Sequence, residues 1–314
     1  MFNCVPCLGG IVLACLSALP LRADAPRVAV DIPPVHALVA QVMAGMGAPD
    51  LIVAPGTSPH GYALRPSEAR TLQDADLVVW VGPGLTPWLG AALPRIAAGA
   101  EIVTLQTHPA TRTLPLRNSA DFGDGGTAGP GDGHDHDAAR GGTSDPHMWL
   151  DPANGRAWLG VIADALARLD PDNAARYGAN AAAAQAALAA LERELVMQLA
   201  AAPPPPFVVF HDGYQYLEAA FDLPAAGAIV LADGSDPSPA RIAAIRAVVR
   251  DRGVRCAFVE PQLNAALVET VIAGTDAAIA QVDPLGAAQA PGPDLYGAVL
   301  RDIVAALVAC GAPD

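Results

Sequence analysis

Short apolar runs alternate with longer amphipathic stretches from residue 27 onward, and this alternation restricts the fold more than any other feature of the sequence. It is typical of β-α units arranged around a mainly parallel sheet. Strands are predicted at 28–32, 51–54, 77–81, 102–105, 207–210, 228–231, 256–260 and 278–282. Helices are predicted at 35–46, at 87–98 and from Ser238 to Gly253. The sequence therefore predicts an α/β protein with two similar parallel-sheet lobes.

A long alanine-rich stretch lies between the two series of β-α units. Residues 151–169 and 173–199 both have helical periodicity, and Asp170-Pro171-Asp172 between them suits a helix start. The second helix would be roughly 40 Å long at about 1.5 Å per residue, which is enough to run along both lobes. The expected organisation is a signal peptide at 1–25, an N-terminal lobe at 26–170, a linking helix at 171–202 and a C-terminal lobe at 203–314.

The segment from about 108 to 144 has no apolar periodicity and is rich in glycine and aspartate. Because it cannot bury enough apolar surface to offset the entropy of ordering, it is predicted to be a mobile loop. His134 and His136 lie within it. A flexible solvated linker with incidental histidines is one open interpretation of this stretch.

The N-terminus carries an apolar run from Gly9 to Leu21, followed by small residues up to Ala25. This pattern predicts a secretory signal, since it is too short to span a bilayer. Lipid anchoring at Cys15 is a less favoured alternative. Removal of the signal would leave Cys256 and Cys310, which could either form a disulfide or remain separate buried thiols.

Three histidines and one aspartate occupy similar places beside predicted strands and helices. His60 and His211 follow strands, Asp283 directly follows the last strand, and His147 precedes a helix at the end of the predicted loop. In open α/β sheets, ligands bind outside the carboxyl ends of the strands, where such residues gather. Two of the four belong to each predicted lobe. If they meet, they would enclose one ion between the lobes.

Three imidazoles and one carboxylate would complete a tetrahedron around Zn²⁺ and leave no position for catalysis. The formal net charge of −14 suits a cation and argues against nucleic acid as a partner. Imidazole donors favour zinc over manganese. Each histidine taken alone could instead be a capping or hydrogen-bonding residue at a strand end.

Four motifs resemble the ZnuA-like zinc-binding proteins of bacterial ABC transporters, a branch of the cluster A-I solute-binding proteins. They are SPHGYALRPS at 58–67, DPHMWLDP at 145–152, FHDGY at 210–214 and EPQ at 260–262. The motifs occur in the family's order, and the resemblance covers nearly the whole chain after the signal. It implies two parallel-sheet lobes joined by one long helix, and a periplasmic carrier, expected to be a monomer, that delivers zinc to an ABC transporter membrane permease.

The resemblance also implies roles for individual residues. His60, His147 and His211 would bind the metal, with Asp283 or water in the fourth position, and Cys256 would pair with Cys310. The loop with His134 and His136 would gather or sense zinc. The related manganese carriers place Glu where His211 stands, which further favours zinc.

Alternatives from other functional classes stay open at this point. A manganese-type carrier, an extracellular metal buffer or an adhesin could share the fold. A zinc hydrolase that uses Glu260 as its base is less favoured, because the chain lacks a His-Glu-x-x-His motif. Glu260 is better interpreted as a hydrogen-bonding residue close to the metal site or between the lobes.

Overall fold

The computed structural model describes residues 25–117, 122, 144–231 and 237–310. The expected signal peptide at 1–25, except for its last residue, the alternative anchor Cys15, and the loop residues His134 and His136 lie outside the described residues. Within the described part, no helix is both long enough and apolar enough to cross a membrane.

The N-terminal half forms a four-stranded parallel sheet in the order β2-β1-β3-β4. Its strands are β1 (Val28–Val30), β2 (Asp50–Leu51), β3 (Leu77–Trp80) and β4 (Glu101–Thr104). The predicted strands lie at these places but extend further. Their apolar runs continue beyond the paired ladder, as at Ile52 and Val53, which are buried without belonging to a strand.

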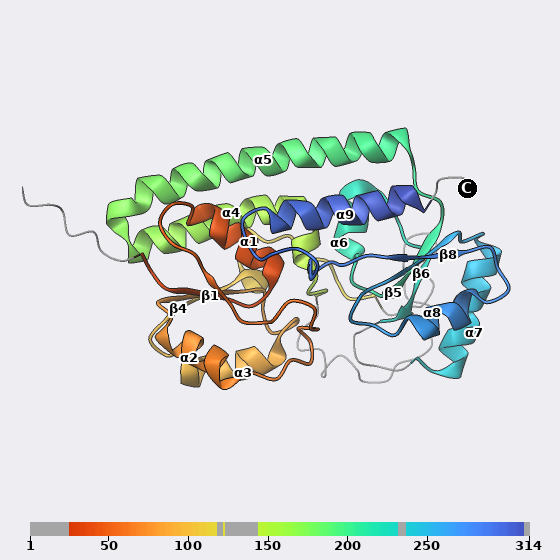
Figure 1. The fold of residues 1–314 in the computed structure, drawn as a ribbon, viewed down its shortest axis with the longest axis horizontal. Helices are drawn as coiled ribbons and strands as arrows, with labels where there is room; N and C mark the ends of the chain where they lie inside the picture. The colour runs from red at the N-terminus through yellow and green to blue at the C-terminus, as the bar shows by residue number, and fades with distance from the viewer. Residues whose placement is uncertain (1–24, 118–121, 123–143, 232–236, 311–314) are drawn as a thin grey trace, which may run out of the picture.

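The C-terminal half repeats this arrangement with the order β6-β5-β7-β8. Its strands are β5 (Phe207–His211), β6 (Gly227–Val230), β7 (Cys256–Val259) and β8 (Ala278–Gln281). The two sheets thus have the same strand order and direction, and the predicted α/β architecture of two similar lobes is confirmed (Figure 1).

Helices cover both faces of each sheet. The outer faces pack against α2 (Pro66–Asp74) and α3 (Pro87–Ile96) in one lobe, and against α7 (Pro239–Asp251) and α8 (Ala265–Ile272) in the other. The other faces share one apolar core, to which both sheets and a common helical layer contribute. This layer consists of α1 (Pro33–Val42), α4 (Pro152–Leu169), α5 (Ala174–Ala201) and α9 (Leu295–Ala309).

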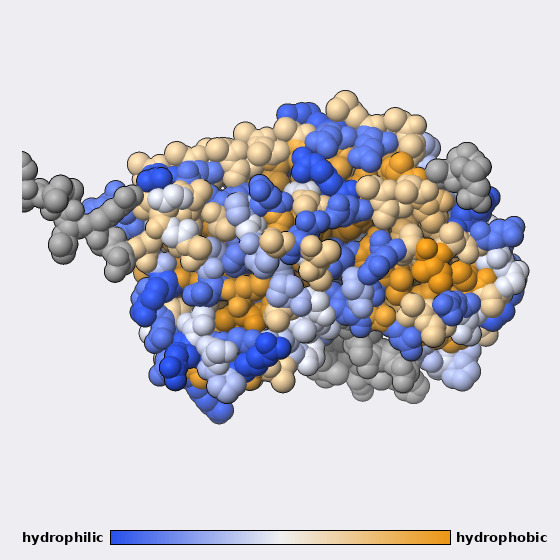
Figure 2. Space-filling model, in the orientation of Figure 1, coloured by the Kyte–Doolittle hydropathy of each residue, from blue (hydrophilic) through white to orange (hydrophobic). Residues whose placement is uncertain are grey.

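The long helix α5 has 28 residues and runs along both lobes, as predicted (Figure 1). In its second half, the buried residues Leu188, Leu191, Leu195 and Leu199 recur every three or four positions and contact the core. Much of its outer surface is alanine, visible as the pale stretch along the upper edge in Figure 2. The limits 26–170, 171–202 and 203–314 for lobes and linker stay a prediction.

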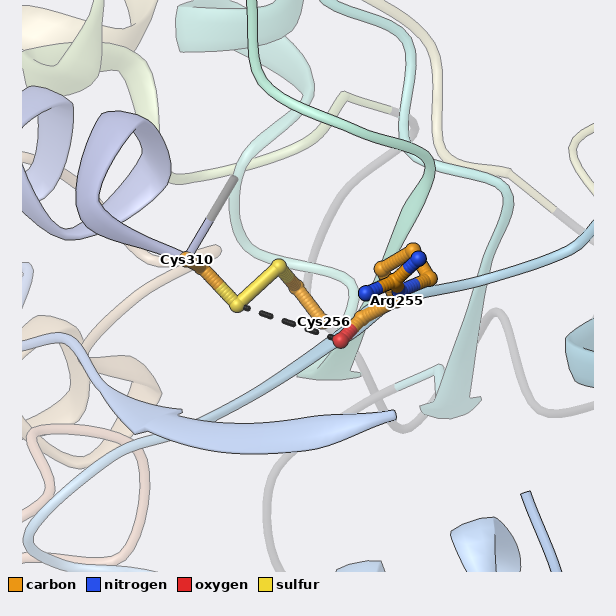
Figure 3. Close-up of a disulfide and its surroundings, with 3 residues drawn as sticks. All are labelled: Arg255, Cys256 and Cys310. Carbon is orange, nitrogen blue, oxygen red and sulfur yellow. Dashed lines mark hydrogen bonds between the residues drawn. A yellow bond between two sulfur atoms is a disulfide. The ribbon is translucent and has the colours of Figure 1, made fainter. Parts of the chain in front are cut away.

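Cys256 and Cys310 form a disulfide that joins β7 to the end of α9 (Figure 3). The two residues are 54 positions apart in sequence, and their Cα atoms are 6.0 Å apart. Cys256 begins β7, so the bridge lies at the amino-terminal edge of the C-terminal sheet, beside the carbonyl group of Arg255. The pairing implied by the family resemblance is confirmed.

Residues 108–117, the start of the predicted mobile loop, are held by specific contacts. The backbone N–H of Arg112 donates to Asn154 Oδ1 of α4 at 2.8 Å, and that of Leu114 donates to the Tyr216 hydroxyl at 2.8 Å. Polar contacts therefore order this stretch although it buries little apolar surface. Tyr216 lies in α6 (Gln215–Phe221), so the stretch reaches from the first sheet to the C-terminal lobe.

Candidate metal centre

Three of the four predicted site residues meet between the two sheets. His60 lies in the loop between β2 and α2, His147 directly precedes the short helix η4 (Met148–Leu150), and His211 is the last residue of β5. One nitrogen from each lies within 4.8 Å of the nitrogens of the other two. His147 and His211 are buried, whereas His60 is partly exposed.

The spacing of the histidine nitrogens matches a tetrahedral zinc site. The distance from His147 Nε2 to His60 Nε2 is 3.4 Å, and the distance from His147 Nε2 to His211 Nε2 is 3.2 Å. Two ligands about 2.05 Å from a tetrahedral ion would lie about 3.3 Å apart. The three imidazoles could therefore share one ion with little rearrangement.

Two buried carboxylates orient the imidazoles. Asp145 Oδ1 lies 2.8 Å from His147 Nδ1 and also accepts the backbone N–H of His147 at 2.9 Å. Glu260 Oε1 lies 2.5 Å from His211 Nδ1 and accepts the hydroxyl of Tyr214 at 3.0 Å. The expectation that Glu260 is a hydrogen-bonding residue near the metal site agrees with these contacts.

A carboxylate beside Nδ1 requires that the proton of a neutral imidazole is on Nδ1. The Nε2 atoms of His147 and His211 then face each other at 3.2 Å with lone pairs and no proton between them. Two lone pairs at this distance repel unless a cation lies between them. The protonation pattern that Asp145 and Glu260 favour therefore suits a bound cation.

The structure does not bring Asp283 into this group of histidines. Its two carboxylate oxygens accept backbone N–H groups of its own loop, from Leu285 at 3.0 Å and from Ala287 at 2.5 Å. The bond from Leu285 follows from the position of Asp283 at the start of a turn, where aspartate commonly accepts the N–H group two residues on. As a fourth metal ligand, Asp283 stays a prediction.

The loop that carries His60 is held by the helix α3 and by its own residues. Trp88 Nε1 donates to the carbonyl oxygen of Pro59 at 2.8 Å, directly beside His60. The hydroxyl of Tyr62 donates to Glu68 Oε1 at 2.6 Å. The first contact reaches the SPHGYALRPS motif from α3 and the second from Glu68 of α2, directly after the motif, so the two helices hold the loop that carries His60.

Two residues near the site were missed in the sequence. Asp145 belongs to the DPHMWLDP motif, and its place two residues before His147 is a typical signal of a turn that caps its own backbone. Arg117 gave no such signal, because its partner Asp212 is 95 positions away. Burial raises the pKa of the Asp212 carboxyl to about 6, although the charge of Arg117 lowers it.

Gly213 lies against Nε2 of His211, the nitrogen that faces the other two histidines. A Cβ atom on this residue would lie 2.3 Å from His211 Nε2. We expect Gly213→Ala to weaken zinc binding by about 10–100-fold, the range typical of losing a residue that orients a metal ligand. A competition titration against a zinc chelator measures this change.

Gly178→Ala is the matched control, since a Cβ there meets no atom within 4 Å. It should bind zinc like the unchanged protein. Equal zinc affinity of Gly213→Ala and Gly178→Ala would contradict the close contact with His211.

The fold and the site together define a two-lobed α/β binding protein with a histidine-lined metal site between its lobes. A sequence model of the family described as "Zinc-uptake complex component A periplasmic" matches residues 28–310. The chain therefore belongs to this family of periplasmic zinc-uptake components.

Individual relatives agree with the family match. The chain is 44% identical over 308 residues to the high-affinity zinc uptake system protein ZnuA of Paracoccus denitrificans, covering 94% of each chain. It is 37% identical over 332 residues to ZnuA of Brucella abortus, covering 96% of this chain and 97% of the relative. A crystal structure of ZnuA has the same fold, with a TM-score of 0.75 at 24% identity, covering 92% of this chain and 100% of that structure.

Proposed function

We propose that this protein binds one zinc ion through His60, His147 and His211 and delivers it to the membrane permease of an ABC importer. The convergence of three imidazole nitrogens at 3.2 Å and 3.4 Å carries this proposal. Asp283, after a rearrangement of its loop, or a water molecule takes the fourth position. Membership of the zinc-uptake family makes the chain a binding component of transport and not an enzyme.

The donor set supports zinc as the cargo. Among the described residues, the group that could share an ion contains imidazoles and no carboxylate. Manganese prefers oxygen donors, whereas imidazole suits zinc. Asp145 and Glu260 are the nearest acidic partners of the histidines, and each lies against an imidazole Nδ1. A manganese-type carrier is therefore disfavoured.

The site suits a carrier better than a hydrolase. Glu260, the candidate base for hydrolysis, lies against His211 Nδ1 and the Tyr214 hydroxyl, so its carboxylate is engaged in positioning a ligand.

The chain is exported through a signal within residues 1–25 and acts as a monomer in the periplasm. His134 and His136 supply an auxiliary zinc-gathering loop.

Metal analysis of the protein purified without an affinity tag tests the binding site. We expect one zinc ion per chain, and none in the triple variant His60→Ala/His147→Ala/His211→Ala. Stoichiometric zinc in the triple variant would remove the proposed site.

A transport assay separates a carrier from a metal buffer or an adhesin. Zinc uptake at low external zinc should require both this protein and its partner permease, and the triple variant should not restore uptake. Equal uptake with and without the permease would favour the buffer.

A further inference from the structure

A buried guanidinium links the start of the predicted loop to the C-terminal lobe. Arg117 follows the short antiparallel bridge between Pro115 and Ser144, and its side chain is only 12% exposed. Its Cζ atom lies 3.7 Å from the ring centroid of Phe122, which is itself buried. The side chain of Arg117 thus extends from the start of the predicted loop towards the C-terminal lobe.

Two carboxylates of the C-terminal lobe hold this guanidinium. Nε of Arg117 donates to Asp212 Oδ1 at 3.0 Å and to Oδ2 at 3.1 Å, and a second contact to Oδ1 comes from Nη2. Nη1 and Nη2 donate to the two oxygens of Glu218 at 2.9 Å and 2.8 Å. Both acidic side chains are almost fully buried. Each binds the guanidinium through two of its nitrogens, a forked geometry that arginine provides and lysine does not.

Asp212 directly follows the proposed ligand His211, and the backbone leaves little freedom between them. The N–H of Asp212 donates to the carbonyl oxygen of Val230 in β6 at 3.1 Å, and the N–H of Gly213 donates to that of His211 at 2.9 Å. The backbone at Gly213 also approaches His211 Nε2 closely. A movement of residues 212–213 would therefore displace the coordinating nitrogen.

Removal of the guanidinium would leave two buried carboxylates facing each other without a counter-charge. Such groups repel, and they move towards water or distort the backbone that carries them. Asp212 and Glu218 are on opposite sides of the turn 213–214, between β5 and α6. The turn that positions His211 would then lose the contact that draws its two sides together.

We propose that Arg117 is a positioning residue for His211, which it holds in the metal-binding orientation through Asp212, and that it thereby sets how long the metal stays bound. The proposal rests on the proposed function of the three histidines as zinc ligands. Arg117 does not touch the metal itself. It connects the start of the long loop to Asp212, the residue after His211, although Arg117 and Asp212 are 95 positions apart in sequence.

The rate of zinc release after addition of an excess of chelator tests the proposal. We expect Arg117→Met to release zinc at least about tenfold faster, since loss of a residue that orients a ligand typically costs about 10–100-fold in affinity and changes in affinity lie mostly in dissociation. Arg117→Lys keeps the charge but lacks the fork, so its rate should lie between those of Arg117→Met and the unchanged protein.

A second measurement separates positioning from general stabilisation. Co²⁺ bound in place of zinc gives visible absorption bands that report the coordination geometry, and these should change in Arg117→Met and less in Arg117→Lys. Arg301→Met is the matched control, because it removes an exposed arginine–carboxylate pair with Glu194. Its zinc release and its Co²⁺ spectrum should match those of the unchanged protein.

Unchanged release rates and Co²⁺ spectra in Arg117→Met would overturn the proposal, even if the unfolding temperature of the metal-free protein fell. If Arg117→Met does not fold, the same two measurements are made on Arg117→Lys, and an unchanged release rate and Co²⁺ spectrum in that variant would overturn the proposal. The triple histidine variant distinguishes failure of the proposed function. Stoichiometric zinc there would overturn both proposals, whereas loss of zinc there with unchanged Arg117 variants would overturn this one alone.

Discussion

Replacing His147 with alanine is expected to weaken zinc binding by more than about 100-fold, beyond the range of about 10–100-fold typical for loss of a residue that only supports a ligand. His147 Nε2 is the central donor of the group, since it lies 3.4 Å from His60 Nε2 and 3.2 Å from His211 Nε2. Its removal also leaves the buried Asp145 carboxylate without its imidazole partner. Chelator competition measures the affinity.

His60→Ala should weaken zinc binding less than His147→Ala, because His60 is the partly exposed member and water can replace its nitrogen. His108→Ala serves as the control, since His108 is a partly exposed histidine outside the group. Thermal unfolding gives an independent readout. Zinc at 100 times its Kd stabilises a protein by about 2.7 kcal/mol, and at the same zinc concentration this gain should fall to about 0.4 kcal/mol or less in His147→Ala. A zinc affinity of His147→Ala equal to that of His108→Ala would exclude His147 as a ligand.

Reduction of the Cys256–Cys310 disulfide is expected to lower the free energy of unfolding by about 4 kcal/mol on the chain-entropy model for a loop of this length. The two cysteines are separated by 54 positions, so the bridge restricts a long stretch of the unfolded chain. Denaturant unfolding with and without reductant measures the difference. The variant Cys256→Ala/Cys310→Ser should have the stability of the reduced protein, both with and without reductant.

Zinc affinity should survive loss of the disulfide. Cys256 is paired in the ladder with Phe207, the first residue of β5, whereas His211 is the last. Four residues of strand separate these two ends by about 13 Å. Loss of zinc binding in the folded cysteine variant would indicate that the bridge supports the metal site directly, contrary to this expectation.

Much of the fold, and the gathering of His60, His147 and His211 in the candidate site, could be predicted because strands and their ends follow local patterns. Parallel strands have continuous apolar runs, and the carboxyl ends of such strands gather at one edge of a sheet. His211 was predicted just beyond its strand and proved to be its last residue. The C-terminal helix α9 was not predicted, although its buried aliphatic residues have helical spacing: Leu295, Val299, Leu300, Ile303, Val304 and Leu307.

The contacts that support the site could not be predicted, because they join residues far apart in sequence. Nothing near Arg117 indicates a partner at Asp212, and the position of Gly213 beside His211 Nε2 depends on the turn after β5. Asp283 shows the opposite case. Its place after β8 satisfied the pattern for a ligand, yet its oxygens accept N–H groups of their own turn.

Residues that come after α5 help to hold the segment around His147. The hydroxyl of Tyr216 donates to the carbonyl oxygen of Asp145 at 3.1 Å, and Trp149 Nε1 donates to that of Pro284 at 2.8 Å. The hydroxyl of Tyr296 donates to the carbonyl oxygen of Trp149 at 2.7 Å. A fragment cut at residue 170 would therefore carry His147 and Asp145 without Tyr216, Pro284 and Tyr296, which make these three bonds. The two halves are therefore not interchangeable modules. A chimera that joins one half of this chain to the other half of a relative would also have to keep the residues that make these bonds.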